Sequence, residues 1–279
     1  MAKRWQHFDF EPPLPLNASR RMAMATWHSR LQNPQAYVCL DLDVTHALAV
    51  IAQMRASHNE RVTLTHVLAA ILGRIMRNNP ELRSVIRHHR IYPRKDVSLL
   101  IQVAVTRDKL SAVVLSELDQ KTPTQIAAEL NQRVAELRNA GDSEQYKGAN
   151  QLIERLPVRV TGWLLRLIGY LSFPLNLNPR LLGLPSNPYG CMRLNNLGAL
   201  GVDDAIGPFV DWMHSPGTFV MMKLRDELQW VNEQVRVRKK LRFWCAADHR
   251  LLDGGAVPRA RAEMDYWLEH SELLWQSAP

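Results

Sequence analysis

Hydrophobic and polar residues alternate along several short stretches of the chain. The clearest stretch runs over residues 97–106, and another runs over residues 37–44. Alternation with a period of two is typical of a β-strand that buries one face. We therefore predict strands over both stretches, and a strand over 111–115 that pairs with 97–106 across a tight turn. The face of the first strand that we expect to be buried holds only aliphatic side chains: Val97, Leu99, Ile101, Val103 and Val105.

Other stretches repeat their apolar residues every three or four positions, which is the spacing of an amphipathic helix. One predicted helix is capped by Thr63 or Thr65 and stops at Asn79-Pro80. Residues 1–15 are expected to be extended, because prolines at 12, 13 and 15 exclude a helix. The remaining predicted helices cover residues 19–31, 45–56, 123–139 and 255–270.

Short strands are predicted near the C-terminal end, at 191–195, 217–225, 228–237 and 241–247. Helices and antiparallel-looking strands mix without a regular strand–helix–strand rhythm, which favours a two-layer α/β sandwich. Neither a glycine-rich phosphate loop nor an internal repeat occurs. We expect one catalytic domain over residues 1–279.

Residues 150–188 are more apolar than a free loop. We expect them to form a helical insertion, because Val160, Trp163, Leu164, Leu167, Ile168 and Leu171 share one helical stripe. Arginines at 155, 159 and 166 flank the stripe. A helix packed on its own domain or on a neighbouring subunit is the simplest interpretation. The alternatives are a lid for an apolar substrate and a helix at a membrane interface.

Composition and charge narrow the classes of function. With 46% hydrophobic and 22% charged residues, the chain has the composition of a folded globular protein. Cys39, Cys191 and Cys245 form neither a disulfide framework nor a metal-ligand pattern, so we expect no metal and a reducing cytoplasm. The net charge of +8 would attract a phosphate-bearing cofactor, a nucleic acid or an anionic membrane surface.

The cationic cluster at 236–242 is best interpreted as a solvated hairpin, because no nucleic-acid-binding motif accompanies it. We expect no nucleic-acid partner. An apolar signal-peptide core is missing, and no apolar run is long enough to span a membrane. The expected location is the cytoplasm, with association at a membrane surface as the alternative.

The strongest candidates for catalytic residues lie in the segment Phe243-Trp244-Cys245-Ala246-Ala247-Asp248-His249-Arg250-Leu251-Leu252-Asp253-Gly254-Gly255. Its pattern is a strand, a polar turn and the start of a helix. His249 falls where the strand ends, and its reference pKa of about 6.5 suits a base at neutral pH. From these residues alone, a purely structural histidine and aspartate are the more common outcome.

This segment resembles the His-x-x-x-Asp-Gly signature shared by the dihydrolipoamide acyltransferases of 2-oxoacid dehydrogenase complexes and by chloramphenicol acetyltransferase. The family's early Arg-Arg/Lys helix is similar to the segment at Arg20-Arg21, and its Pro-Glu-Leu helix end is similar to residues 80–82. Its Thr-Ile-Ser-Asn-Leu-Gly strand-turn is similar to residues 193–198. The likeness runs from about residue 16 to residue 274 and is interrupted at 150–188.

The resemblance implies a chloramphenicol acetyltransferase-like sandwich whose mixed, mainly antiparallel sheet carries helices on one face. It implies an acyltransferase with acyl-CoA as the expected co-substrate. His249 would act as general base on a thiol or hydroxyl acceptor, which attacks an acyl thioester without forming an acyl-enzyme. Asp253 would pair with Arg20 or Arg21 and fix the turn that aims the histidine. The family's trimers place the site between subunits, so a homotrimer or a multiple of it is expected.

One position departs from the family pattern. The serine that donates a hydrogen bond to the tetrahedral oxyanion is replaced here by Asn195. An amide can also donate, and an oxyanion donor contributes about 2.7–4 kcal/mol. Two hypotheses follow: a catalytic site with a substituted donor, or a non-catalytic trimeric scaffold. A membrane-surface acyltransferase is the third.

Two further motifs resemble functional sites but are better explained by structural roles. Asp108-Lys109 resembles a lipoyl-lysine turn but joins two predicted core strands, so we expect no covalent lipoyl group. A stand-alone member without lipoyl and subunit-binding domains is the expectation. Cys245 could in principle form a Cys/His pair with His249, but its place inside a strand favours a small core residue.

Overall fold

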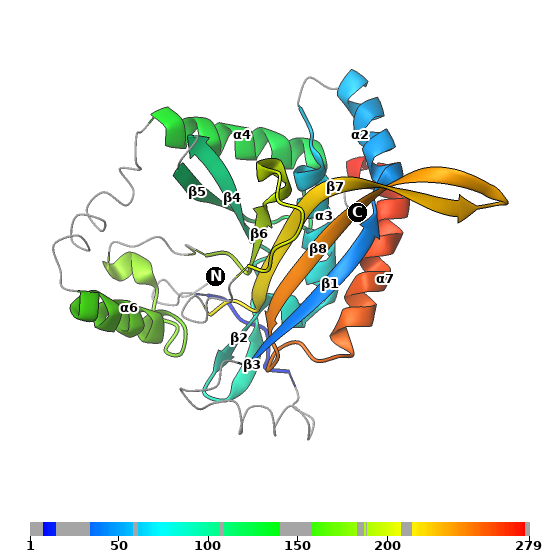
Figure 1. The fold of residues 1–279 in the computed structure, drawn as a ribbon. Coiled ribbons are helices and arrows are strands. Elements are labelled where there is room, and N and C mark those ends of the chain that lie inside the picture. The colour runs from blue at the N-terminus through cyan, green and yellow to red at the C-terminus, as the bar shows by residue number, and fades with distance from the viewer. Residues whose placement is uncertain are drawn as a thin grey trace.

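The computed structural model describes residues 8–14, 34–57, 61–106, 109–139, 158–182, 187, 189–207 and 214–276. A six-stranded sheet in the order β1-β8-β7-β6-β4-β5 forms one layer (Figure 1). A separate two-stranded sheet pairs β2 (Ser84–Arg87) with β3 (Arg90–Pro93). The six strands are β1 (Gln35–Asp43), β4 (Leu99–Thr106), β5 (Lys109–Leu115), β6 (Met192–Asn196), β7 (Gly217–Val231) and β8 (Gln234–Asp248).

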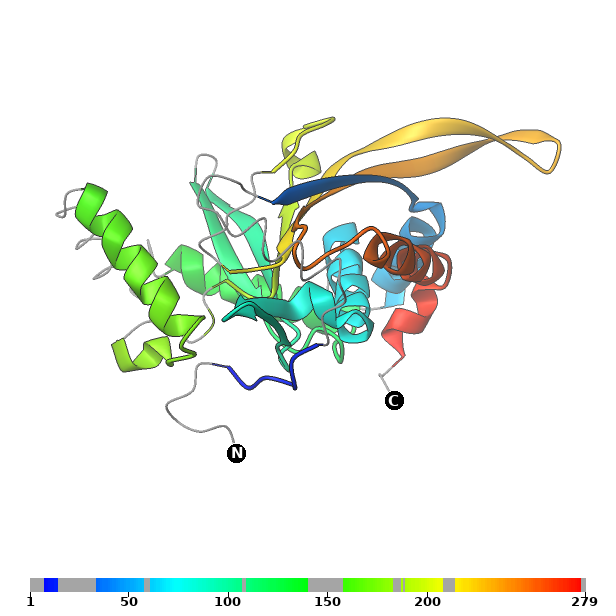
Figure 2. The same ribbon diagram turned by 90° about the horizontal axis from the view of Figure 1, so that it is seen from below.

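Helices form the second layer against one face of the large sheet (Figure 2). They are α2 (Thr45–Ser57), α3 (Leu64–Asn78), α4 (Pro123–Asn139) and α7 (Ala256–Glu269). The pairs β1/β8, β8/β7 and β4/β5 are antiparallel, whereas β7/β6 and β6/β4 are parallel. The predicted two-layer sandwich with a mixed, mainly antiparallel sheet is therefore confirmed.

Most predicted elements agree with the structure in their bounds. Helix α4 has the predicted bounds, and α3 begins after Thr63, whose backbone N–H donates to Nδ1 of His66 at 3.1 Å. Residues 8–14 are extended, with a bridge between Phe10 and Arg94. The predicted helix over 19–31 lies outside the described residues. The described residues also include the short 3₁₀ turns η1 (Pro80–Arg83), η2 (Pro179–Leu182), η3 (Gly198–Leu200) and η5 (Ser271–Trp275).

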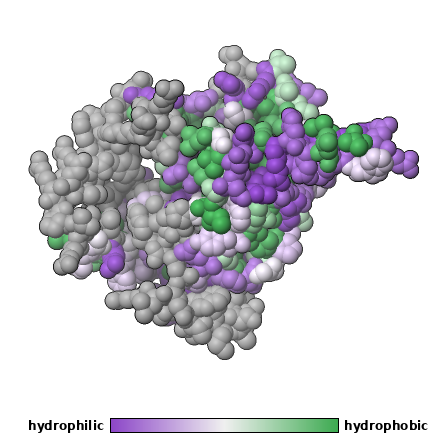
Figure 3. Space-filling model, viewed as in Figure 1, coloured by the Kyte–Doolittle hydropathy of each residue, from purple (hydrophilic) through white to green (hydrophobic). Residues whose placement is uncertain are grey.

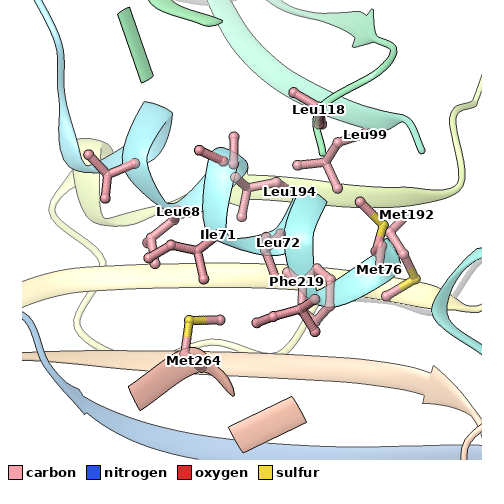
Figure 4. Close-up of a cluster of buried hydrophobic side chains, with 14 of the residues drawn as sticks. Leu68, Ile71, Leu72, Met76, Leu99, Leu118, Met192, Leu194, Phe219 and Met264 are labelled. Atoms are coloured by element: carbon pink, nitrogen blue, oxygen red, sulfur yellow. The ribbon is translucent and has the colours of Figure 1, made fainter. Parts of the chain in front are cut away.

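Helix α3 is the centre of the core, because nearly every turn of it is buried. Its Leu68, Ile71 and Leu72 lie against side chains from the sheet, among them Leu194 and Phe219 (Figure 4). A Cβ atom at Gly73 would lie 2.6 Å from the backbone carbonyl of Leu118, so only glycine permits this close approach.

Strands β7 and β8 form one long hairpin that projects beyond the rest of the molecule (Figures 1 and 2). The prediction of three separate strands at 217–225, 228–237 and 241–247 is therefore wrong, whereas the strand predicted at 191–195 matches β6. The single turn lies at Asn232-Glu233, whose φ angles of 50° and 63° are those of a tight hairpin turn. Both hairpin strands carry charged residues on both faces, so they lack the alternation of apolar and polar residues by which a continuous strand is recognised in a sequence.

The cations at 236–242 lie on this hairpin and form ion pairs. Lys239 contacts Asp226 at 2.6 Å, and Lys240 lies 3.5 Å from Asp43 on β1. Arg242 contacts Asp204 at 2.7 Å. The prediction of a solvated, charged hairpin is confirmed.

Apolar side chains also gather on the projecting part of the hairpin (Figure 3). Leu228 pairs with Val237 and Trp230 pairs with Val235, so these four side chains share one face of the ribbon. Leu228 is 71% exposed and Trp230 is 72% exposed. Water-exposed apolar patches of this kind commonly mark interaction sites.

Helix α6 (Val158–Ser172) lies at the edge of the molecule, away from the other helices (Figure 2). Its C-terminal end is anchored by Phe173, which packs on Phe8 and stacks on His214. Val160 is exposed, and Trp163 is 63% exposed. The predicted helix is confirmed, but packing of the whole stripe on its own domain is wrong for these two residues.

Candidate active site

His249 lies directly after the last residue of β8. Its backbone N–H donates to the carbonyl of Pro34 at 2.8 Å, which extends the pairing of β8 with the chain before β1. The N–H groups of Leu251 and Leu252 donate to the carbonyl of Asp248 at 2.9 and 3.0 Å. These bonds close a tight turn and hold the half-buried His249 at the strand end.

Asp248 and Arg250 stabilise this turn from either side of His249. Nε of Arg250 donates to Oδ1 and Oδ2 of Asp248 at 2.9 and 3.1 Å, and Nη2 donates to Oδ2 at 2.5 Å. The Asp248 side chain is only 5% exposed. The sequence interpretation assigned no role to either residue, although the Asp-His-Arg triplet was a usable signal.

Asp253 lies three residues before the first residue of helix α7. Its Oδ1 accepts hydrogen bonds from the N–H groups of Gly255 and Ala256 at 3.0 and 3.2 Å. A carboxylate that accepts from the first turn satisfies free donors and complements the helix dipole. The predicted partners Arg20 and Arg21 lie outside the described residues, so that ion pair stays a prediction.

A cavity of about 190 Å³ opens between the sheet and helices α3 and α7. His249 and Asp253 are part of its wall. The rest of the wall is almost entirely apolar, with side chains from β1, β8, α3 and α7. The sequence interpretation missed this cavity, because it depends on which strand lies beside β8.

Cys245 also lines the cavity, four residues before His249 on the same face of β8. Residues four apart in a strand are separated by about 13 Å, too far for direct proton transfer. Burial raises the pKa of the Cys245 thiol to about 12, so the thiol stays protonated at neutral pH. Burial also raises the pKa of Cys191, which lies in the core. The interpretation of Cys245 as a small core residue agrees with this geometry.

Asn195 lies on β6, two strands away from β8 in the sheet. The register pairs Asn195 with Val220 and Val220 with Trp244, so these three side chains share one face. His249 follows the opposite alternation, together with Phe243 and Ala247 of the cavity wall. Within one chain, Asn195 and His249 therefore lie on opposite faces of the sheet.

The amide of Asn195 has a second notable feature. Its Oδ1 is buried and has no hydrogen-bond partner among the residues that the structure describes. A buried polar atom of this kind is costly unless another molecule supplies its partner.

Helix α6 contributes no residue to the described wall of the cavity. A lid formed by 150–188 therefore stays a prediction, since residues 150–157, 183–186 and 188 lie outside the described part of the chain. None of the described helices has the length and apolarity needed to span a bilayer. Over the same described segments, no three potential metal-binding side chains gather at one place.

Comparison with solved structures agrees with this architecture. The cubic core of the pyruvate dehydrogenase multienzyme complex matches with a TM-score of 0.62 and 18% identity over 95% of this chain and 93% of that one. Dihydrolipoamide acetyltransferase of Azotobacter vinelandii matches with a TM-score of 0.61 and 18% identity over the same shares. A chloramphenicol acetyltransferase matches with a TM-score of 0.56 and 14% identity over 90% of this chain and 96% of that one. The predicted chloramphenicol acetyltransferase-like fold is thereby confirmed.

No curated protein matches the chain. A sequence profile of a protein family does match, over residues 13–154, and ends before the segment that carries His249. Its description is 2-oxoacid dehydrogenases acyltransferase (catalytic domain), and the match covers just over half of the chain. The chain therefore belongs to the acyltransferase catalytic-domain family of the 2-oxoacid dehydrogenases.

Proposed function

We propose that this chain transfers an acyl group from coenzyme A, or a related thioester, to a thiol or hydroxyl acceptor, with His249 as the general base. The observation that carries the proposal is the position of His249. It stands at the end of β8 in the wall of an apolar cavity, on a turn held by Asp248 and Arg250. A fixed base at a water-poor site can take a proton without competition from solvent.

The proposed reaction has two steps and no covalent enzyme intermediate. His249 takes the proton of the acceptor S–H or O–H, and the sulfur or oxygen attacks the thioester carbonyl. The resulting tetrahedral oxyanion receives a hydrogen bond from the Asn195 amide. The carbon–sulfur bond then breaks, the acyl group stays on the acceptor, and the leaving thiolate takes the proton from His249.

A relative supports these roles. The structure of the Azotobacter vinelandii enzyme was determined to investigate a serine, a histidine and an asparagine four positions after that histidine in its catalytic mechanism. In this chain, Asp253 stands four positions after His249. An acid in place of the amide keeps a side-chain oxygen that can cap α7, as Asp253 does here.

The proposal requires assembly, because one chain presents His249 and Asn195 on opposite faces of its sheet. A trimer, or a multiple of it, would place His249 of one subunit opposite Asn195 of the next. The exposed apolar face of the β7–β8 hairpin, formed by Leu228, Trp230, Val235 and Val237, supports burial between subunits.

The test is release of free CoA thiol from acyl-CoA donors of different chain lengths, with dihydrolipoamide as the acceptor. The wild type should release thiol only when the acceptor is present, and the His249→Gln variant should lose this activity by about 10²–10⁴-fold. Release without an acceptor would indicate a hydrolase. No release by the wild type with any donor would favour the non-catalytic scaffold.

A second candidate function is acyl transfer at a membrane surface, favoured by the exposed face of α6. Trp163 and Tyr170 are exposed there beside the exposed Arg166, and α6 contains no acidic residue. Aromatic and cationic side chains together suit the surface of an anionic bilayer. Co-sedimentation with anionic and with neutral vesicles tests this, and a Trp163→Ala/Tyr170→Ala variant should lose the binding. Recovery of the wild type in the supernatant with both vesicle types would exclude it.

A further inference from the structure

We infer that the cavity beneath His249 holds the acyl chain of the donor, and that it selects a saturated chain of about six to eight carbons. This inference rests on the proposed function and adds the substrate class. It follows from the shape, the lining and the position of the cavity.

The floor of the cavity is a ladder of three residue pairs on β1 and β8. Ala36 pairs with Ala247, Val38 with Cys245, and Leu40 with Phe243. All six side chains line the cavity. The smallest pair lies nearest His249 and the largest pair lies farthest from it, about 20 Å along the strands. The floor therefore has room beside the base and closes at the far end.

The opposite wall is helix α7. Val257, Ala260 and Met264 line the cavity at spacings of three and four residues, which place them on one face of the helix. Met264 is buried, whereas Ala260 and Val257 are half-buried. Ala260 is the smallest of the three, so the cavity is wider beside Ala260 than beside Val257 or Met264.

The polar groups of the lining lie apart from this floor and wall. His249 and Asp253 come from the turn between β8 and α7. The amide of Asn79 is engaged elsewhere, because its Nδ2 donates to the carbonyl of Ile75 and to Glu263 at 2.9 and 2.8 Å. A polar or charged acyl group would lose its hydration here without a replacement, so the lining favours an alkyl chain.

The volume sets the length of that chain. Protein interiors contain few voids larger than a water molecule, so 190 Å³ in the core is unusual. An aliphatic cavity of about 150 Å³ accommodates the six carbons of benzene. The present cavity therefore holds a chain of about six to eight carbons with its carbonyl beside His249.

The experiment measures binding and turnover separately. Calorimetric titration of the purified protein compares acetyl-CoA with octanoyl-CoA. Each buried methylene group contributes about fourfold in affinity, so octanoyl-CoA should bind at least about 50-fold more tightly. The variant Ala260→Phe fills the cavity and should remove most of this difference. Ala262→Phe, which adds the same side chain on the exposed side of α7, is the matched control and should retain it.

A second variant with the opposite effect on cavity size tests the inference even if Ala260→Phe does not fold. Val257→Ala enlarges the cavity and should shift the preference in kcat/KM toward acyl chains longer than octanoyl. Melting curves of all variants establish that they are folded.

The outcomes separate this inference from the proposed function. Equal affinity of the wild type for acetyl-CoA and octanoyl-CoA would overturn the acyl-chain assignment, even if both were turned over. Tight octanoyl-CoA binding that Ala260→Phe abolishes, without turnover of any donor, would support the cavity and refute the transferase. An unchanged chain-length preference in both cavity variants would also overturn the assignment.

Discussion

The carboxylate of Asp248 and the guanidinium of Arg250, the two neighbours of His249 in the sequence, form a hydrogen-bonded ion pair. Three donor–acceptor contacts of 2.9, 3.1 and 2.5 Å join them, and the backbone N–H of Arg250 adds a fourth to Asp248 at 2.9 Å. A planar guanidinium and a carboxylate in this geometry are held with defined orientation. The backbone of His249 is therefore fixed by its two neighbours in the sequence.

Replacing Arg250 should destabilise the protein. Arg250→Ala leaves the buried carboxylate of Asp248 without its cation, and we expect a loss of about 3 kcal/mol in the free energy of unfolding. Chemical denaturation measures it. The control is Lys239→Ala, which breaks the exposed pair with Asp226 and should cost less than about 1 kcal/mol. Similar losses in both variants would show that the Asp248–Arg250 pair does not stabilise the turn.

Asp253 can be tested for its two roles separately. Asp253→Ala removes the two hydrogen bonds to the N–H groups of Gly255 and Ala256 at the start of α7 and should cost about 1 kcal/mol from that cause alone. Asp253→Asn keeps an oxygen that can cap the helix but removes the charge. If Asp253 also pairs with Arg20 or Arg21, the asparagine variant should still lose about 3 kcal/mol. Wild-type stability of Asp253→Asn would refute that pairing.

The composite site makes a prediction about mixed assemblies. His249→Ala and Asn195→Ala chains should each be nearly inactive alone. Co-expressed and purified with two different tags, they should regain up to about one quarter of the wild-type activity, because a quarter of the subunit contacts then join an intact His249 to an intact Asn195. A co-assembled mixture with no regained activity would contradict a site shared between subunits.

The pH dependence of stability should reflect His66, near the start of α3. Burial, and to a lesser extent the charge of Arg55, lowers the pKa of His66 from 6.5 to about 4. A pKa lowered in the folded state means that neutral His66 stabilises the fold. That contribution is complete above pH 6.5 and is lost as the pH falls from 6.5 toward 4, by about 1.4 kcal/mol per pH unit.

The test compares denaturation midpoints at pH 7, 6 and 5 for the wild type and His66→Gln. Glutamine can accept from the Thr63 N–H as the histidine does, so the cap is retained. The variant should be less sensitive to acid over this range. Parallel losses in both proteins would assign the acid sensitivity to other groups.

The sequence was sufficient for most of the secondary structure, because alternation and helical spacing report directly on burial. It predicted the bounds of α4 to the residue and the end of β8, at Asp248, to within one residue. It failed on the hairpin, where charged residues on a solvent-exposed ribbon look like breaks between strands. It did not decide what covers Trp163, which is exposed in the single chain, since spacing shows which side chains share a helical face but not what lies against that face.

The site was only partly predictable for a related reason. His249 and Asp253 lie close in the sequence and share a recognisable motif. The relation between His249 and Asn195 depends instead on the strand order β8-β7-β6 and on the register of both pairings. The pairing of Ala36 with Ala247 joins residues far apart in the chain in the same way. Neither of these spatial relations produces a pattern in the local sequence from which it could be predicted.

Strand β8 carries Val235 and Val237 of the projecting hairpin near one end and is followed by His249 at the other. Since side chains alternate between faces, a single inserted residue anywhere between Val237 and His249 would turn the histidine out of its cavity, whereas two inserted residues would return it. Insertions or deletions in β8 that keep the site intact should therefore involve an even number of residues. The irregular pairing of β7 between Met221 and Leu224 has the opposite property, because a bulge can absorb an odd residue. Insertions during divergence are thus tolerated differently by two strands that lie side by side.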